Sequence, residues 1–152
     1  MSTDSRIDWT IDKATERDLD RIVEMLAQAD LPTSGIAPII DHFLVVRTAG
    51  KVVAAGAIEP HGPDGLLRSV VVDASFRGLG LGKRITESLL LSSGVDLYLL
   101  TETAESFFES IGFECIERAQ APMALRASEE FRCLCPESAA FMRRSSGPKA
   151  GD

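Results

Sequence analysis

Three glycines at alternate positions, Gly78, Gly80 and Gly82, lie in the stretch RGLGLGK, directly after the apolar run LLRSVVV. Glycine adopts positive φ easily and lets a ligand approach the backbone, and the N–H groups at a helix start attract anions. The spacing therefore predicts a phosphate cradle where a strand is followed by a helix. It does not fit the dinucleotide fingerprint G-x-G-x-x-G, whose third glycine comes one position later, and it does not fit the P-loop, because Arg84 replaces the hydroxyl residue that binds magnesium there.

The elements around this stretch are predicted from the spacing of apolar residues. Strands are expected at residues 7–14, 43–48, 51–59, 66–72, 95–100, 113–118 and 135–144, with a turn at 60–65. Helices are expected at 15–31, where Thr15 and Asp18 form a start signal, at 81–93 and at 103–112, with shorter helical pieces within 31–42 and 123–131. The sequence thus predicts one domain, residues 1–143, built on a mixed α/β sheet, and a disordered tail, 144–152.

Size and charge exclude several classes of protein. With 152 residues, 45% of them hydrophobic, the chain suits a single core, and no apolar run approaches the roughly 18 residues of a membrane span. A net charge of −7 would repel nucleic-acid phosphates, and the N-terminal residues lack the basic and apolar regions of a secretory signal. We therefore expect a cytoplasmic protein with a small-molecule partner, and neither nucleic acid nor membrane as a ligand.

The longer stretch VVVDASFRGLGLGKRI resembles the acetyl-coenzyme A motif of the GNAT N-acetyltransferase superfamily, V-x-P-x-x-[QR]-x-x-G-x-[GA]. The motif residues present are Val72, Arg77, Gly80 and Gly82. Asp73-Ala74 stands where the motif has x-Pro. The order of elements is also that of GNAT domains, so the resemblance covers residues 7–143. It implies an α/β (α+β) class and the GNAT acyl-CoA N-acyltransferase fold, with a central mixed, mostly antiparallel sheet that is splayed between strands 4 and 5 and flanked by helices.

By this resemblance the co-substrate is acetyl-coenzyme A. Main-chain groups of Val70 and Val72 are expected on the pantetheine amides, and the amides from Gly78 to Lys83 on the pyrophosphate. The full set of residues expected to hold the cofactor is Val70, Val71, Val72, Arg77, Gly78, Leu79, Gly80, Leu81, Gly82, Lys83 and Phe108. The implied enzyme is an N-acetyltransferase that transfers the acetyl group directly to a primary amine.

Direct transfer needs an oxyanion donor, a base for the ammonium and an acid for the leaving thiolate. The stretch TETAESFFESIGF resembles the family's N-x-x-A-x-x-x-Y-x-x-x-G-F, with Thr101 in place of the usual Asn and Phe108 in place of the thiolate-protonating Tyr. Without a phenol there, water is expected to protonate the thiolate. Glu59 is the expected base, with Glu102 behind it, and Thr101 is the third catalytic candidate. His61 is placed in the turn as an incidental residue.

A finer resemblance links the chain to the GNAT branch encoded in arsenic-resistance operons. The stretches that carry it are LP-x-x-G, LLRSV, YLLTETA, FF, GF and EF…CP-x-SA-x-FM. It implies that the acceptor is an arsenic-containing amino acid or its phosphinate analogue. Such an acceptor carries a carboxylate and a second anionic head, so its pocket needs a cation. We expect Arg68 to supply it, with a surface ion pair as the other role open to Arg68, and Leu31, Thr33 and Ser34 to close over the acceptor.

Other functions stay open at this point. The acceptor is alternatively a protein N-terminus, a lysine or a polyamine, which the acidic balance would attract, or the domain binds acyl-coenzyme A without turnover, given Phe108. A thiol-based metalloid-binding protein is a further alternative, through Cys115, Cys133 and Cys135, although Cys115 is expected to be a small buried residue and no metal site is predicted. The oligomeric state is open as well, and a homodimer would pair through the C-terminal strand.

Overall fold

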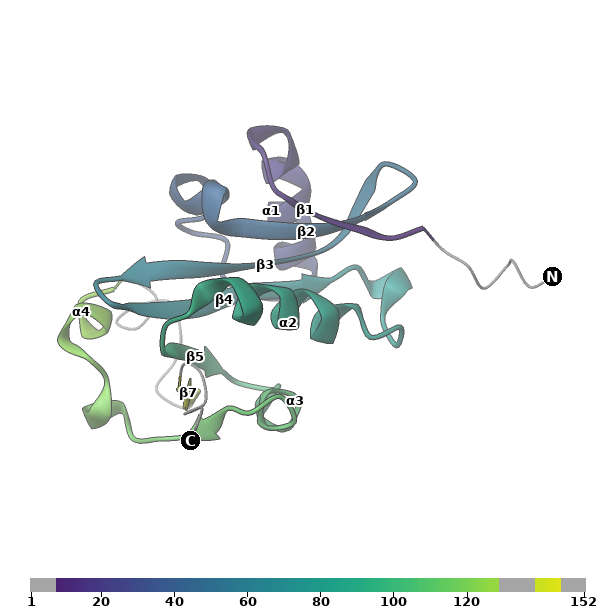
Figure 1. Ribbon diagram of the computed structural model, residues 1–152. Helices are drawn as coiled ribbons and strands as arrows, with labels where there is room; N and C mark the ends of the chain where they lie inside the picture. Colours follow the sequence, from purple (N-terminus) through teal and green to yellow (C-terminus); the bar gives the residue numbers. More distant parts are fainter. Residues whose placement is uncertain (1–7, 129–138, 146–152) are drawn as a thin grey trace. The chain divides into compact units, whose positions relative to one another are not determined.

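The computed structural model describes residues 8–128 and 139–145 (Figure 1). Its strands are β1 (Thr10–Lys13), β2 (Phe43–Thr48), β3 (Lys51–His61), β4 (Asp64–Val72), β5 (Leu97–Thr101), β6 (Glu114–Cys115) and β7 (Ala140–Arg144). Its α-helices are α1 (Leu19–Gln28), α2 (Leu81–Ser93), α3 (Glu105–Glu109) and α4 (Met123–Arg126), and its short 3₁₀ turns are η2 (Glu16–Asp18), η3 (Ala37–His42), η4 (Ala74–Phe76) and η5 (Arg118–Gln120). No helix in the described part of the chain combines the length and the apolar character needed to cross a membrane.

The strands form a seven-stranded sheet in the order β1-β2-β3-β4-β5-β7-β6. β4 and β5 run parallel, whereas β1–β2, β2–β3, β5–β7 and β6–β7 pair antiparallel. The mixed sheet predicted from the sequence is therefore confirmed. The ladder between β4 and β5 joins Gly65 to Leu97 and Leu66 to Tyr98, although both strands, described throughout, are longer than that. This short ladder agrees with the splay predicted between the fourth and fifth strands.

The chain packs as two compact units. Among the described residues, the first unit holds 8–57 and 69–89, and the second holds 58–68, 90–128 and 139–145. β3 and β4 therefore contribute residues to both units. The glycine-rich stretch lies in the first unit, and the catalytic candidates lie in the second.

The core of the first unit covers both faces of its part of the sheet. Val45 on β2 packs in one cluster with Ile22 of α1, whereas the next residue, Val46, packs in another cluster with Ile85 of α2. Because successive strand residues point to opposite faces, α1 and α2 cover opposite faces here (Figure 1). Burial against the sheet on each side holds the start of α2, and with it the glycine-rich stretch, in place.

The second unit has a separate core. Leu66 at the start of β4 packs with Tyr98 of β5, Leu125 of α4 and Phe141 of β7. The rings of Tyr98 and Phe141 stack with their centres 5.6 Å apart. Burial raises the pKa of the Tyr98 phenol, so this tyrosine stays a neutral packing residue at neutral pH.

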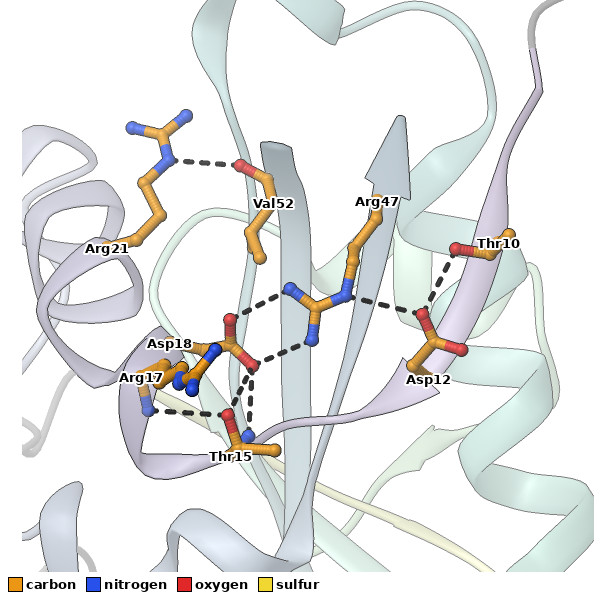
Figure 2. A network of polar contacts seen from close by, with 8 residues as sticks. All are labelled: Thr10, Asp12, Thr15, Arg17, Asp18, Arg21, Arg47 and Val52. Atoms are coloured by element: carbon orange, nitrogen blue, oxygen red, sulfur yellow. Dashed lines mark hydrogen bonds and ion pairs between the residues drawn. The ribbon is translucent and has the colours of Figure 1, made fainter. Parts of the chain in front are cut away.

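A network of polar side chains joins β1, the start of α1 and β2 (Figure 2). Thr15 and Asp18 form the cap that the sequence predicts: Asp18 Oδ2 accepts the Thr15 N–H at 2.9 Å, and Thr15 Oγ1 accepts the Arg17 N–H at 3.3 Å. Arg47 then donates to both oxygens of Asp18, from Nη1 to Oδ1 at 2.8 Å and from Nη2 to Oδ2 at 2.9 Å. Only 8% of the Asp18 side chain is exposed. A bidentate pair with so little exposure is costly to break, because it leaves a buried charge without its partner.

This pair predicts a loss of stability in acid. The pKa of the Asp18 carboxyl lies below its ordinary value, mainly because Arg47 donates hydrogen bonds to it. The folded chain therefore binds this proton less tightly than the unfolded chain, so the stabilisation is complete above the unfolded pKa of about 4 and is lost as the pH falls towards the folded pKa. We expect Asp18→Asn to lower the free energy of unfolding at neutral pH by about 1–3 kcal/mol and to flatten its decline in acid. Urea denaturation at a series of pH values measures both effects.

Asp12→Asn is the matched control, because Asp12 also contacts Arg47 but its side chain is 47% exposed. We expect this variant to keep the wild-type pH slope and nearly all of the stability. A wild-type slope in Asp18→Asn would contradict the assignment of the acid sensitivity to this carboxylate.

The hairpin between β3 and β4 is tighter than predicted. Instead of a turn over 60–65, the connection is the pair Gly62–Pro63, because Gly62 adopts φ +64 and reverses the chain within two residues. The predicted turn residues on either side of this pair, 60–61 and 64–65, belong to β3 and β4. His61, predicted to lie in the turn, is instead the last residue of β3.

The C-terminal strands also differ from the prediction. The strand expected at 113–118 is reduced to Glu114–Cys115, and Cys115 is exposed rather than buried. Arg144 ends β7, as the predicted strand 135–144 has it, and so does not belong to the tail predicted at 144–152; its Nε donates to the Ile111 carbonyl at 3.1 Å. The sequence marks Arg144 as a solvated charge because it does not show which carbonyl the side chain meets. The later residues of the expected tail lie outside the described residues.

Candidate functional site

The glycine-rich stretch lies between η4 and α2 in the first unit. Gly78 has φ +82 and Gly80 has φ +79, conformations that other residues rarely adopt. A Cβ added at either glycine would meet no atom of the described structure within 4 Å, so the space beside this backbone is open. Gly82, in contrast, lies within α2 and is not at positive φ. The alternating glycines therefore divide into two that shape the loop and one that belongs to the helix.

The start of α2 offers donors and positive charge. The Arg84 N–H donates to the Gly80 carbonyl at 3.0 Å, so the N–H groups of Leu81, Gly82 and Lys83 precede the regular helical bonds. Partial positive charge collects at such a helix start, and the side chains of Lys83 and Arg84 are exposed there. Leu81 is buried and anchors this turn to the core. The arrangement suits an anion that approaches from the exposed side.

β4 carries the valines expected to contact pantetheine, but not in simple alternation. Ser69 has φ +60, a left-handed conformation that interrupts the strand. Beyond it, Val71 belongs to the core on the α1 side, whereas Val70 and Val72 pack on the α2 side. An unbroken strand would place Arg68 on the same face as Val70 and Val72, and the conformation of Ser69 removes the basis for that placement.

Three polar side chains meet at the β3–β4 hairpin in the second unit. Arg68 Nη1 donates to Glu59 Oε1 at 3.1 Å, and Glu59 Oε2 lies 3.6 Å from His61 Nε2. The exposed fraction of the side chain is 3% for Arg68, 14% for His61 and 23% for Glu59. His61 Nε2 is buried and has no hydrogen-bond partner among the described residues. The expected base and the expected acceptor-binding cation are therefore paired, and the pair is largely buried rather than on the surface.

The remaining catalytic candidates lie before α3, also in the second unit. Thr101 ends β5, and its Oγ1 accepts the Ala104 N–H at 3.0 Å, a contact that shapes the turn into α3. Glu102 is exposed. Phe108 is 8% exposed and contacts Phe113 edge to face, with ring centres 5.8 Å apart. Thr101 and Phe108 thus have packing and turn-forming contacts of their own.

The expected lid residues lie in the segment between α1 and η3 in the first unit. Leu31, Thr33 and Ser34 are exposed there. Asp30, which has φ +60, ends the turn that follows α1. Ile36, which is only 2% exposed, anchors the other end of the segment. An exposed segment with two anchored ends is suited to close over a ligand, and this role stays a prediction.

Cys115 lies beside two carboxylates in the second unit. Its Sγ donates to Glu105 Oε2 at 3.0 Å, and the ligand atoms of Cys115, Glu105 and Glu109 lie within 4.8 Å of one another. The hydrogen bond to Glu105 and the charges of both carboxylates raise the pKa of the Cys115 thiol to about 11. The thiol is therefore neutral at neutral pH, which makes it a poor nucleophile and a poor metal ligand. Cys133 and Cys135, the other cysteines of the metalloid hypothesis, lie outside the described residues.

Sequence reasoning missed one partner of the glycine-rich stretch. Asp73, which follows β4, forms an ion pair with Arg21 on α1, 52 positions away in the sequence. The sequence offers a signal at Asp73, because Asp73-Ala74 stands where the resembled motif has x-Pro. Arg21 carries no signal of its own, because an arginine on a helix is ordinarily solvated.

Comparison with known proteins gives one family and one fold. The sequence model of the acetyltransferase (GNAT) domain matches residues 40–115. None of the curated proteins matches the chain in sequence. The fold is similar to that of N-acetylglutamate synthase from Neisseria gonorrhoeae, complexed with coenzyme A and N-acetyl-glutamate, with a TM-score of 0.80, 14% identity, and coverage of 93% of this chain and 36% of that chain.

Two further solved structures are similar along nearly their whole length. Rv2747 from Mycobacterium tuberculosis, in complex with CoA and NLQ, has a TM-score of 0.77, 21% identity, and coverage of 90% of this chain and 98% of that chain. An acetyltransferase of the GNAT family from Staphylococcus aureus has a TM-score of 0.72, 15% identity, and coverage of 91% and 99%. The chain spans only about a third of the length of the synthase, 36%. At 21% identity or less, these likenesses confirm the predicted fold and leave the acceptor open.

Proposed function

The chain belongs to the acetyltransferase (GNAT) domain family, and on this premise we propose that it transfers the acetyl group of acetyl-coenzyme A directly to the primary amine of a small amino acid. The family makes the chain an N-acetyltransferase with acetyl-coenzyme A as co-substrate. The finer part of the proposal is the acceptor, an amino acid whose side chain carries arsenic or phosphorus in an anionic head.

The observation that carries this proposal is the backbone between η4 and α2. Gly78 and Gly80, both at positive φ, border open space that a Cβ would fill, and the N–H groups that begin α2, before its regular helical hydrogen bonds, follow directly. These features fit a pyrophosphate, which the amides from Gly78 to Lys83 would bind. Other residues proposed to hold coenzyme A are Val70, Val71, Val72 and Arg77. When bound, acetyl-coenzyme A supplies an activated thioester.

Two observations support an amino-acid acceptor. Glu59 presents a carboxylate that Arg68 holds in place, and a carboxylate is the group that pairs with an ammonium. The similar synthase was solved with N-acetyl-glutamate, which is an acetylated amino acid. The arsenic or phosphorus head rests on the resemblance of stretches such as LLRSV and YLLTETA to the arsenic-resistance branch. Arg68 is the proposed cation for that head, and Thr33 and Ser34 are the proposed lid residues.

Glu59 is the proposed general base. Its second oxygen lies 3.6 Å from His61 Nε2, which is beyond hydrogen-bond distance, so the two groups would have to approach each other before a proton could pass between them. Glu102 is the exposed carboxylate that would act as base in place of Glu59. Thr101 stays a candidate for a catalytic role on the resemblance alone. Because Phe108 provides no phenol, we assign protonation of the leaving thiolate to water.

Turnover of acetyl-coenzyme A against four classes of acceptor tests the proposal. The classes are amino acids with arsinate or phosphinate heads, ordinary amino acids, polyamines and peptides. We expect the first class to give a kcat/KM at least about tenfold above that of ordinary amino acids, since the additional anionic head adds a charge-assisted hydrogen bond. Release of coenzyme A with a thiol reagent, and the mass of the acetylated product, measure the reaction.

The other outcomes separate the alternatives. Turnover only with ordinary amino acids would remove the arsenic or phosphorus head from the proposal. Turnover confined to polyamines or peptides would contradict the amino-acid acceptor and leave the family assignment standing. Binding of coenzyme A without turnover of any class would favour an acyl-coenzyme A-binding module. The cytoplasmic location, the single domain of residues 1–143 and the homodimer stay predictions.

A further inference from the structure

Asp73 joins the end of β4 to the segment that leads into the glycine-rich loop. Its Oδ1 accepts the Ser75 N–H at 2.8 Å and so caps η4, and its carbonyl accepts the Phe76 N–H at 2.8 Å. Its own N–H donates to the Val53 carbonyl at 2.8 Å. Every polar group of this residue therefore contributes to the direction in which the chain leaves the sheet.

Arg21 on α1 holds the second oxygen of this carboxylate. Its Nη2 donates to Asp73 Oδ2, while its Nε donates to the Val52 carbonyl at 3.0 Å, the contact drawn in Figure 2. The exposed fraction is 21% for the Arg21 side chain and 12% for that of Asp73. Both groups are thus mostly buried, and the guanidinium ties α1, β3 and the end of β4 together. A third contact, to Glu24 Oε1 at 3.1 Å, lies on the more exposed side, where Glu24 is 55% exposed.

The loop that follows has little packing to determine its own shape. Arg77, Gly78, Leu79 and Gly80 are all exposed, and both glycines border open space. At its far end the loop is anchored by the buried Leu81. At its near end the anchors are the contacts of Asp73, the hydrogen bond from Arg77 Nε to the Val72 carbonyl at 3.2 Å, and Phe76, which packs in the same core cluster as Leu81. A flexible glycine loop that loses one of its anchors has more conformations to give up when it binds a ligand.

We propose that Arg21 and Asp73 form a clamp, the Arg21–Asp73 clamp, that positions the pyrophosphate-binding loop of this chain for coenzyme A. The proposal rests on the proposed function, because it assigns these residues to the same cofactor loop. Both are positioning residues, which act through the backbone from η4 to Gly80. The resembled motif has a proline in this turn, whose ring would restrict the backbone covalently. In this chain the cap on η4 and the ion pair with Arg21 restrict the backbone instead.

The alternative is that the clamp stabilises the fold in general. The same unit offers a control for this, the Arg47–Asp18 pair, which is held by two hydrogen bonds, is also mostly buried, and also joins the α1 region to a strand. Within the part of the chain that the structure describes, no hydrogen bond or ion pair joins this pair to residues 73–80. A variant of this pair therefore reports the effect of lost stability alone.

Isothermal titration with coenzyme A tests the clamp. We expect Arg21→Met and Asp73→Ala to raise the Kd by about 5- to 30-fold. Asp73→Asn should have a smaller effect, because its amide oxygen can still cap η4. Arg47→Met should lower the stability of the fold and keep the wild-type Kd. Glu24→Gln should keep both the wild-type stability and the wild-type Kd. Amide hydrogen exchange of residues 74–80 gives a second readout, and we expect it to accelerate in Arg21→Met but not in Arg47→Met.

Two results would overturn the clamp while the proposed function stands: a wild-type Kd in folded Arg21→Met, or an equal rise of the Kd in Arg47→Met. If Arg21→Met does not fold, Arg21→Lys replaces it, since one ammonium cannot serve both the Val52 carbonyl and Asp73 with the geometry of the guanidinium. A wild-type Kd in Arg21→Lys and in Asp73→Asn together would then overturn the clamp. Failure of the wild-type chain to bind coenzyme A is a different result, because it removes the proposed function and the clamp with it.

Discussion

Replacing Gly80 with valine is expected to raise the Kd for coenzyme A by about 5- to 150-fold, the change that about 1–3 kcal/mol of backbone strain produces. Gly80 has φ +79, a conformation in which a β-branched residue is strained, so valine would pull the loop away from its present shape. The valine side chain would also fill the open space beside the backbone, where no atom lies within 4 Å of a Cβ. Titration calorimetry with coenzyme A measures the loss.

Gly50→Val is the matched control for Gly80→Val. Gly50 lies in the turn between β2 and β3 with φ +77, and a Cβ there would also meet no atom within 4 Å. The two substitutions therefore impose the same kind of strain, and both should lower the melting temperature. Only Gly80→Val should weaken binding of coenzyme A. The assignment of the loop would be wrong if folded Gly80→Val bound coenzyme A like the wild type, or if Gly50→Val lost as much affinity.

Features that depend on neighbouring residues could be predicted from the sequence. The bounds of β2 and α2 match the predicted ranges 43–48 and 81–93, because apolar periodicity and flanking glycines act locally. The cap formed by Thr15 and Asp18 likewise depends on two residues three positions apart. The glycine loop was found for the same reason: a positive φ at Gly78 and Gly80 is a local requirement that few other residues meet.

Features that depend on distant partners could not be predicted. Nothing near Arg21 indicates that its guanidinium reaches Asp73, and nothing in SVVV marks Ser69 as the residue with a left-handed backbone. Glu59 and Arg68 were assigned separate roles, as base and as acceptor-binding cation, although they lie on paired strands and contact each other. One signal was present, since an arginine inside the apolar run LLRSVVV is expected to be buried and therefore paired.

Arg68→Lys is expected to lower kcat/KM for amino-acid acceptors while the Kd for coenzyme A stays unchanged. The side chain of Arg68 is 3% exposed and donates to Glu59, so loss of its planar fork disturbs a largely buried pair. Full removal, as in Arg68→Met, should cost about 2–5 kcal/mol in transition-state stabilisation, and the lysine variant part of that. Arg143→Lys is the control, because Arg143 forms an ion pair with Asp96 at 3.0 Å in the same unit and its side chain is 36% exposed.

The choice of acceptor separates the two roles of Arg68. If its guanidinium binds the anionic head of the acceptor, Arg68→Lys raises the KM for amino acids more than that for the corresponding amines without a carboxylate. If it only holds Glu59 in place, Arg68→Lys lowers kcat/KM equally for both kinds of acceptor, and the change is in kcat. The loss in Arg68→Lys then does not add to the loss in Glu59→Gln, because the two residues act as one unit. Unchanged kinetics of Arg68→Lys with every amino acid would make the arginine purely structural, and the arsenic or phosphorus acceptor would then lose the cation proposed for its anionic head.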